Sequence, residues 1–140
     1  MTSLLDVNLL VALLWEDHLH HASARRWFAS AAESWSTCAI TQTGFVRVSA
    51  NPQVLAHPVA VGEAVAVLRE AIGHPAHSFL ADHLGFVDNP LVPHDRLVGH
   101  RQVTDAHLIA IARHHGSIVR TFDVGMESLA PDVVRVVPTG

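Results

Sequence analysis

Short hydrophobic blocks alternate with longer amphipathic blocks along the chain, and this pattern predicts strands and helices in turn. The first block, residues 3–7, is short and apolar except for Asp6 near its end, which is typical of a buried parallel strand. Later blocks rich in apolar and β-branched residues predict further strands. These cover residues 36–41, 84–88 (LGFVD), 117–122 and, as an edge strand, 133–137.

Helices are predicted where apolar residues recur every three to four positions. Residues 59–72 have an apolar face at this spacing, and Gly73 ends the helix; Gly116 ends another in the same way. The pair Asn51-Pro52 stops a third, because proline disfavours helical backbone in the residue before it. The predicted helices cover residues 9–14, 18–32, 42–49, 59–72 and 103–115.

This order of elements predicts an α/β fold. Strands that alternate with helices form right-handed crossovers, which gives a mainly parallel sheet of four to five strands between two helical layers. The 140 residues contain no repeat or linker that divides the chain, so we expect one domain over residues 1–140. Ligands of such sheets bind at the carboxyl ends of the strands.

Composition and charge exclude several classes of protein. No apolar run approaches the ~20 residues of a membrane span, and the first residues lack the basic flank of a signal peptide, so we expect a soluble cytoplasmic protein. The absence of lysine excludes a Walker A loop, and a single cysteine, Cys38, excludes an internal disulfide. The net charge of −4 requires any contact with nucleic acid to be local, with help from a bound cation.

Three aspartates stand where the predicted fold would bring them together. Asp6 and Asp123 end predicted strands, and Asp105 opens a predicted helix. Clustered carboxylates repel one another unless a cation lies among them, and hard oxygen ligands suit Mg²⁺ or Mn²⁺. Taken singly, each aspartate is better explained as a helix cap or a turn residue, where aspartate is common. A charge inside the apolar run around Asp6 is harder to explain without a partner.

Four segments taken together resemble a known family. In chain order they are LLDVNLLVALLWEDH, TQTGFVRVSANP, GHRQVTDAHLIAIARHHG and TFDVG. They span nearly the whole chain and resemble one branch of the VapC toxins, which are PIN-domain proteins. The resemblance implies a PIN-like α/β/α sandwich, Mg²⁺-dependent cleavage of RNA, a VapB-like antitoxin and, commonly, a homodimer. It places the family's acids on Asp6, Asp105 and Asp123.

Five polar side chains are candidates to assist these acids. Thr104 and Thr121 each stand close to one of them in the sequence and are expected to help hold the metal or its water, and Asn8 is expected to orient the first acid. Such side chains more often bind backbone groups. Arg47 and Arg101 are candidates for contact with phosphate. An ordinary surface ion pair is an equal alternative for each arginine.

One position departs from the family pattern. Many PIN domains carry a glutamate early in the helix after the second strand, and here Gly44 occupies that place. Glycine inside a helix costs about 1 kcal/mol relative to alanine, so its presence indicates a close approach of two backbones. We therefore expect a metal site with three acids instead of four, and weak metal binding without substrate.

The sequence as a whole predicts an endoribonuclease in which metal-activated water attacks the phosphodiester bond. The alternatives are a non-catalytic module that binds RNA or a protein partner, which the missing glutamate favours, and a nuclease acting on DNA. A zinc enzyme is disfavoured although the chain has 12 histidines, because the spacing of a zinc motif is missing.

Overall fold

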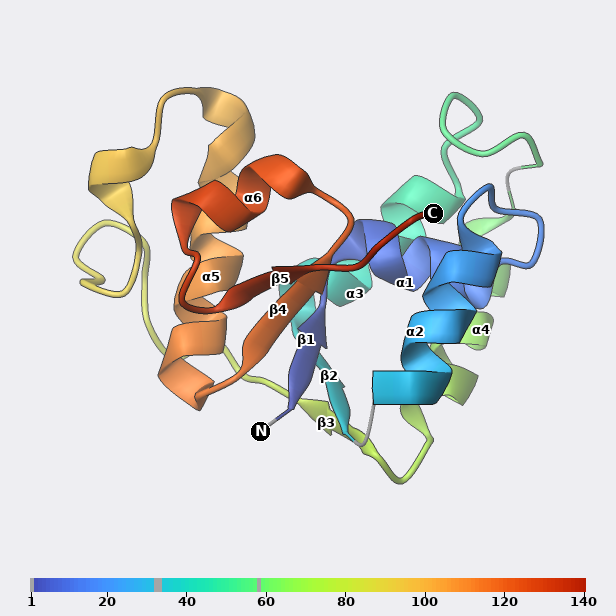
Figure 1. Ribbon diagram of the computed structural model, residues 1–140. Coiled ribbons are helices and arrows are strands. Elements are labelled where there is room, and N and C mark those ends of the chain that lie inside the picture. Colours follow the sequence, from blue (N-terminus) through green and yellow to red (C-terminus); the bar gives the residue numbers. More distant parts are fainter. Residues whose placement is uncertain (1, 32–33, 58) are drawn as a thin grey trace.

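Five short strands form the centre of the molecule in a computed structural model that describes residues 2–31, 34–57 and 59–140 (Figure 1). Their order in the sheet is β3-β2-β1-β4-β5, and every neighbouring pair is parallel. The strands are β1 (Ser3–Leu5), β2 (Trp35–Thr37), β3 (His77–Phe79), β4 (Ile118–Thr121) and β5 (Val134–Val136). The predicted parallel sheet is thus confirmed.

Helices cover both faces of this sheet. On one side lie α1 (Val7–Leu14), α2 (His21–Ala31), α3 (Ala39–Ser49) and α4 (Val61–Ile72), and on the other α5 (Val103–His115) and α6 (Val124–Leu129) (Figure 1). Two 3₁₀ turns, His94–Arg96 and His100–Gln102, precede α5. The arrangement confirms the predicted α/β/α sandwich. None of the described helices has the length and apolar character needed to cross a membrane.

The alternating directions of side chains in β1 divide the core in two. Leu4 is fully buried among residues of α5 and α6, including Ile109 and Met126, whereas Leu5 is fully buried on the opposite face with Leu9 and Phe45. Complete burial of one such side chain contributes about 1.5–3 kcal/mol. The central strand is therefore fixed from both sides, and so is the residue that follows it, Asp6.

The predicted strand at residues 84–88 is wrong. That segment is a loop, in which the Asn89 side chain donates to Gly85 O (2.9 Å) and accepts from Leu91 N (3.0 Å). The strand in this part of the chain is β3, at the edge of the sheet. Its residues are half-buried or exposed, so it lacks the apolar run by which a buried strand is recognised.

Several predicted boundaries also differ. The strand expected at 3–7 ends at Leu5, and α1 begins at Val7 instead of residue 9. The strand expected at 36–41 ends at Thr37, because Thr41 accepts a hydrogen bond from Cys38 N (3.0 Å) and starts α3 early.

The structure also differs from the prediction in the second helix and in the region after β4. The helix expected at 18–32 begins at His21, and residue 32 lies outside the described residues. Helix α6 was not predicted, since six residues are too few to show a helical period.

Candidate active site

Asp6 lies at the carboxyl end of β1 and caps α1. Its backbone N–H continues the β1–β4 pairing by donating to Arg120 O (2.9 Å). Its Oδ1 accepts from Val7 N (2.8 Å), and its Oδ2 accepts from the Thr121 hydroxyl (2.7 Å). Burial raises the pKa of the Asp6 carboxyl, and the charge of Asp123 adds to the rise, whereas the two hydrogen bonds oppose it.

The Thr121 side chain connects the polar residues of this rim. Thr121 ends β4 and is completely buried. While its hydroxyl donates to Asp6, its oxygen accepts from Asp123 N (3.0 Å) and from Asn8 Nδ2 (3.2 Å). These three bonds use the full capacity of a hydroxyl group. The predicted polar neighbour Asn8 therefore reaches Asp6 through Thr121, and it also accepts from Phe122 N (3.2 Å).

The other two acids come from helix starts on the same rim. Asp123 is exposed and caps α6 through Gly125 N (2.9 Å). Asp105 is half-buried in the first turn of α5. Burial, followed by the charges of Asp6 and Asp123, raises the pKa of Asp105 to about 6. Asp6 and Asp123 are therefore close enough to Asp105 to affect its ionisation, although the three acids are far apart in the sequence.

The donor groups fit a hydrated cation better than a tightly enclosed one. Within residues 2–31, 34–57 and 59–140, no three His, Cys, Asp or Glu side chains converge closely enough to hold a metal between them. Beyond the effect of burial, the charge of Asp123 raises the pKa of Asp6, and the charges of Asp6 and Asp123 raise the pKa of Asp105, so negative charge accumulates at this rim. Hard oxygen donors in a region of uncompensated negative charge suit Mg²⁺, which keeps several of its waters.

Three of the predicted site residues lie outside this network. Thr104 is exposed and lines a shallow pocket with Ile40. Arg47 is exposed in a groove between α3 and α4, and Arg101 is exposed in the 3₁₀ turn before α5. Among the described residues, none of the three side chains forms a hydrogen bond or ion pair with the acids. Their roles stay predictions.

Gly44 lies where α3 crosses α1. A Cβ atom at this position would overlap the side chain of Val7, so the glycine does mark a close approach, although the group nearest to it is a side chain and not the second backbone that the sequence indicated. A glutamate at this position would therefore clash with α1, the helix that begins directly after Asp6.

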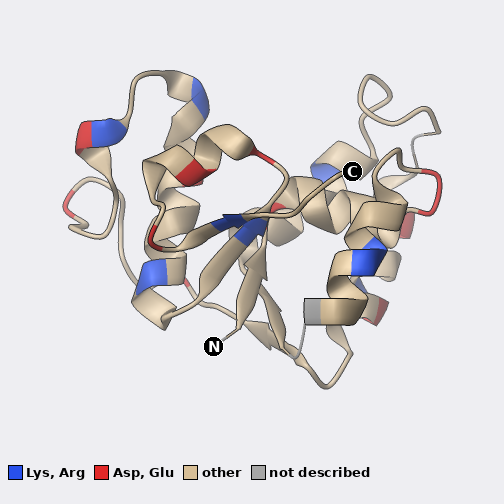
Figure 2. Cartoon of the chain, viewed as in Figure 1, with Lys and Arg blue, Asp and Glu red and all other residues tan. Residues whose placement is uncertain are grey.

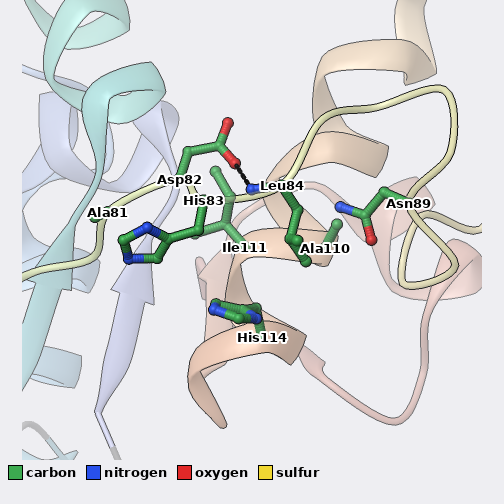
Figure 3. A pocket seen from close by; sticks show the side chains of 8 residues that line it. All are labelled: Ala81, Asp82, His83, Leu84, Asn89, Ala110, Ile111 and His114. Atoms are coloured by element: carbon green, nitrogen blue, oxygen red, sulfur yellow. Dashed lines mark hydrogen bonds between the residues drawn. The ribbon is translucent and has the colours of Figure 1, made fainter.

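Three histidines gather at the end of α5 and in the loop after β3. His83, in the loop after β3, lies near His114 at the end of α5, with ring centroids 5.8 Å apart, and His115 is 5.0 Å from His114. Figure 3 shows His83 and His114 at a small pocket that Asp82 and Asn89 also line. In the described part of the chain these side chains do not form a metal-binding group.

Comparisons with known proteins identify the family. A sequence model of the PIN domain matches residues 3–130. Ribonuclease VapC38 of Mycobacterium tuberculosis is 50% identical over 133 residues, covering 91% of this chain and 89% of that protein. Ribonuclease VapC39 of the same organism is 38% identical over 138 residues, covering 97% and 99%. The chain therefore belongs to the PIN domain family. Within that family it is a VapC-type protein, which confirms the resemblance inferred from its sequence.

A solved structure supports the same fold. The crystal structure of Mycobacterium tuberculosis VapC20, described as a toxin that cleaves the sarcin–ricin loop, superposes with a TM-score of 0.65. The superposition covers 98% of this chain and 100% of that one, at 17% sequence identity. At this identity the likeness concerns the fold alone.

Proposed function

We propose that this protein is a Mg²⁺-dependent endoribonuclease, with Mn²⁺ as an alternative metal, and that it is the toxin of a type II toxin–antitoxin pair. The observation that carries the proposal is the electrostatic coupling of Asp105 to Asp6 and Asp123, three acids brought to one rim of the sheet. The names of the relatives, which are ribonucleases, support the same activity.

Asp6, Asp105 and Asp123 are the residues that would hold the metal. Because the described side chains do not enclose an ion, we infer that one or two carboxylates bind it directly and that water fills the remaining positions. When bound, the metal supplies Lewis acidity toward water and toward the phosphate oxygens, which hydrolysis of a phosphodiester requires.

The chain's own contribution is to hold the Asp6 carboxylate in one orientation while leaving part of its hydrogen-bonding and metal-binding capacity unused. Each of its oxygens accepts one hydrogen bond, from Val7 N or from Thr121, and each retains a second lone pair for a ligand. Among the described residues, no group donates a hydrogen bond to the Asp105 carboxylate, so both of its oxygens are available. Thr121 is a positioning residue, since it acts through Asp6 and through the backbone of Asp123.

The substrate we propose is single-stranded or looped RNA, whose backbone can reach a recessed rim. The proposed partners are a VapB-like antitoxin that neutralises the activity and a second copy of this chain in a homodimer. We place the reaction in the cytoplasm, where the protein would encounter both RNA and the antitoxin.

The test compares nucleic acids, metals and variants of the purified protein. We expect labelled RNA to be cut in Mg²⁺ and left intact in EDTA, and we expect labelled DNA to be left intact. Asp6→Asn and Asp105→Asn should each abolish cleavage, while Asp88→Asn, which removes an exposed acid from the loop after β3, should leave it unchanged.

Each alternative predicts a different result in the same experiment. The observation that favours a non-catalytic module is the lack of an enclosed metal site among the described residues, together with Gly44 in place of an acid. RNA binding that persists in EDTA, with no cleavage in any metal, would support that module. Cleavage of DNA alone would support a DNA nuclease, and full activity of Asp6→Asn would refute the roles assigned to the acids.

A further inference from the structure

Two arginines stand side by side on the sheet, outside the group of acids. Arg120 of β4 and Arg135 of β5 are partners in the register of the two parallel strands, so their side chains leave the same face. Figure 2 shows the two basic segments next to each other on β4 and β5. Nothing in the sequence singles them out, because the register of two strands leaves no local signal.

The positive charge of this pair is not neutralised. Arg120 Nε donates to Ser3 Oγ (3.3 Å), and Arg135 Nη1 donates to two backbone carbonyls, those of Pro131 and Val134. In the part of the chain that the structure describes, neither guanidinium forms an ion pair. Asp132, which lies near Arg135 in the sequence, instead binds Arg113 at 2.8 Å.

Two like charges in register destabilise a sheet, so their retention requires an explanation. Burial lowers the pKa of Arg120, and the positive charge of the neighbouring Arg135 lowers it further. Arg135 is exposed and Arg120 half-buried, so an anion from solution can reach both. The Nη2 groups of both arginines have no hydrogen-bond acceptor among the described residues.

We propose that Arg120 and Arg135 together bind a phosphodiester group of the RNA strand, on the face of β4 opposite Thr121 and upstream of the rim that carries the acids. The inference rests on the proposed ribonuclease function. A planar guanidinium binds phosphate oxygens through two parallel hydrogen bonds, and two such groups in register form a clamp for one phosphate.

Two observations favour RNA over an acidic protein segment as the ligand. The first is the Trp27 ring, which lies 5.8 Å from Arg120 Cζ and is half-buried, so part of its surface is available for stacking a base. The second is continuity with the acids, because Arg120 O accepts from Asp6 N and Arg120 directly precedes Thr121. One strand thus carries a phosphate-binding side chain on one face and positions an acid from the other.

The experiment measures binding of a fluorescent single-stranded RNA oligonucleotide in EDTA, where the proposed cleavage does not occur, over a series of salt concentrations. For the double variant Arg120→Gln/Arg135→Gln we expect affinity to fall about tenfold or more. We also expect the slope of log K against log salt to decrease by about 0.7 for each phosphate that the variant no longer binds. Arg69→Glu is the control for overall charge, because Arg69 is an exposed arginine on α4.

Charge reversal separates binding from folding. Arg135→Glu would face Arg120 as an ion pair, so we expect the melting temperature to stay the same or rise while RNA affinity falls. Arg69→Glu makes the same change in net charge and should keep most of the affinity. Wild-type affinity and salt slope in both Arg135→Glu and the double Gln variant would overturn the inference.

The remaining outcomes distinguish this inference from the proposed function. Unchanged RNA binding, combined with arginine-dependent binding of a polyglutamate peptide, would assign the pair to an acidic protein segment and overturn the inference. RNA binding that depends on both arginines, without cleavage in any metal, would support the clamp while refuting the ribonuclease. Cleavage that is unaffected by either variant at subsaturating RNA would refute the clamp alone.

Discussion

The side chain of Val7 occupies the space that a side chain at Gly44 would need. A Cβ atom on Gly44 would lie 2.5 Å from Val7 Cγ2, a distance that real Cβ atoms essentially never show. Val7 is β-branched and is the first residue of α1, so it has little freedom to move aside. The glycine is therefore required by the packing of α3 against α1.

We predict that Gly44→Ala destabilises the protein. Overpacking costs about 1–3 kcal/mol, and the gain in helix propensity returns only about 1 kcal/mol, so the free energy of unfolding should fall by up to about 2 kcal/mol. Urea unfolding followed by circular dichroism measures the change.

The variant Val7→Ala tests whether the contact between residues 7 and 44 is the cause. In a Val7→Ala background the clash is relieved, so Gly44→Ala should then stabilise the protein by up to about 1 kcal/mol. If Gly44→Ala proves equally destabilising in both backgrounds, the contact with Val7 is not the cause.

The Thr121 hydroxyl should matter more for catalysis than its size suggests. Thr121→Val keeps the shape of the side chain but leaves Asp6 Oδ2 and Asp123 N without their shared partner. We expect the free energy of unfolding to fall by about 1–3 kcal/mol and RNA cleavage to fall by more than the folded fraction explains. Thr121→Ser retains the hydroxyl and should restore cleavage. Equal losses in both variants would indicate a packing role only.

The ionisation of Asp105 should report the group of acids directly. In EDTA, NMR of the Asp105 carboxyl carbon should give a pKa of about 6, and Asp123→Asn should lower this pKa by removing a negative charge. Because the folded-state pKa lies above the ordinary value of 3.8, the folded protein binds this proton more tightly than the unfolded chain. The metal-free protein should therefore lose stability as the pH rises from about 4 to 6.

Added Mg²⁺ should reduce this loss of stability with rising pH, because a cation favours the ionised carboxylate. The pKa of Asp105 should then fall, and the dependence of stability on pH should flatten. A pKa near 3.8 for Asp105 in EDTA would mean that the charges of Asp6 and Asp123 do not affect its ionisation.

His77 provides a pH effect that is independent of the acids. Its ring packs 4.6 Å from Trp35 and is hydrogen-bonded to Thr37 Oγ1 (2.8 Å), and burial lowers the pKa of His77 below its ordinary value of 6.5. The unfolded chain therefore takes up the proton first, and stability is lost as the pH falls from 6.5 through the folded-state pKa. In His77→Gln this part of the pH dependence should be smaller. Titration of the ring proton by NMR checks the direction.

The sequence predicted those elements that have a strong physical signature of their own. Strands β1 and β4 lie in the middle of the sheet and are rich in apolar or β-branched residues, apart from Arg120, so the acids that follow them could be placed on one rim. Strand β3 is half-exposed at an edge, and its sequence His-Ser-Phe has no such signature. The apolar LGFVD segment has the stronger strand pattern, because hydrophobicity alone does not distinguish a strand from a loop held by the side chain of Asn89.

The sequence predicted the positions of site residues only where these follow from the order of strands and helices along the chain. Asp6 and Asp123 follow strands, and parallel strands end on the same rim, so their proximity follows from topology. The orientation of Arg47 does not follow from topology, since it depends on how α3 packs against α4. The place of Thr121 near an acid in the sequence predicts a role at the site, but its hydrogen bonds to Asn8 and Asp6 depend on rotamers that no sequence pattern encodes.

The bond between Thr121 and Asp6 joins residues 115 positions apart, and this distance has a consequence for the protein during its synthesis. A ribosome that has made Asp6 must add more than a hundred residues before β4 can pair with β1, so until then the growing chain carries its first acid without the bond to Thr121. Contacts between such distant segments are among the last to form. Under the proposed function, the site would therefore be complete only after the ribosome has added Asp123.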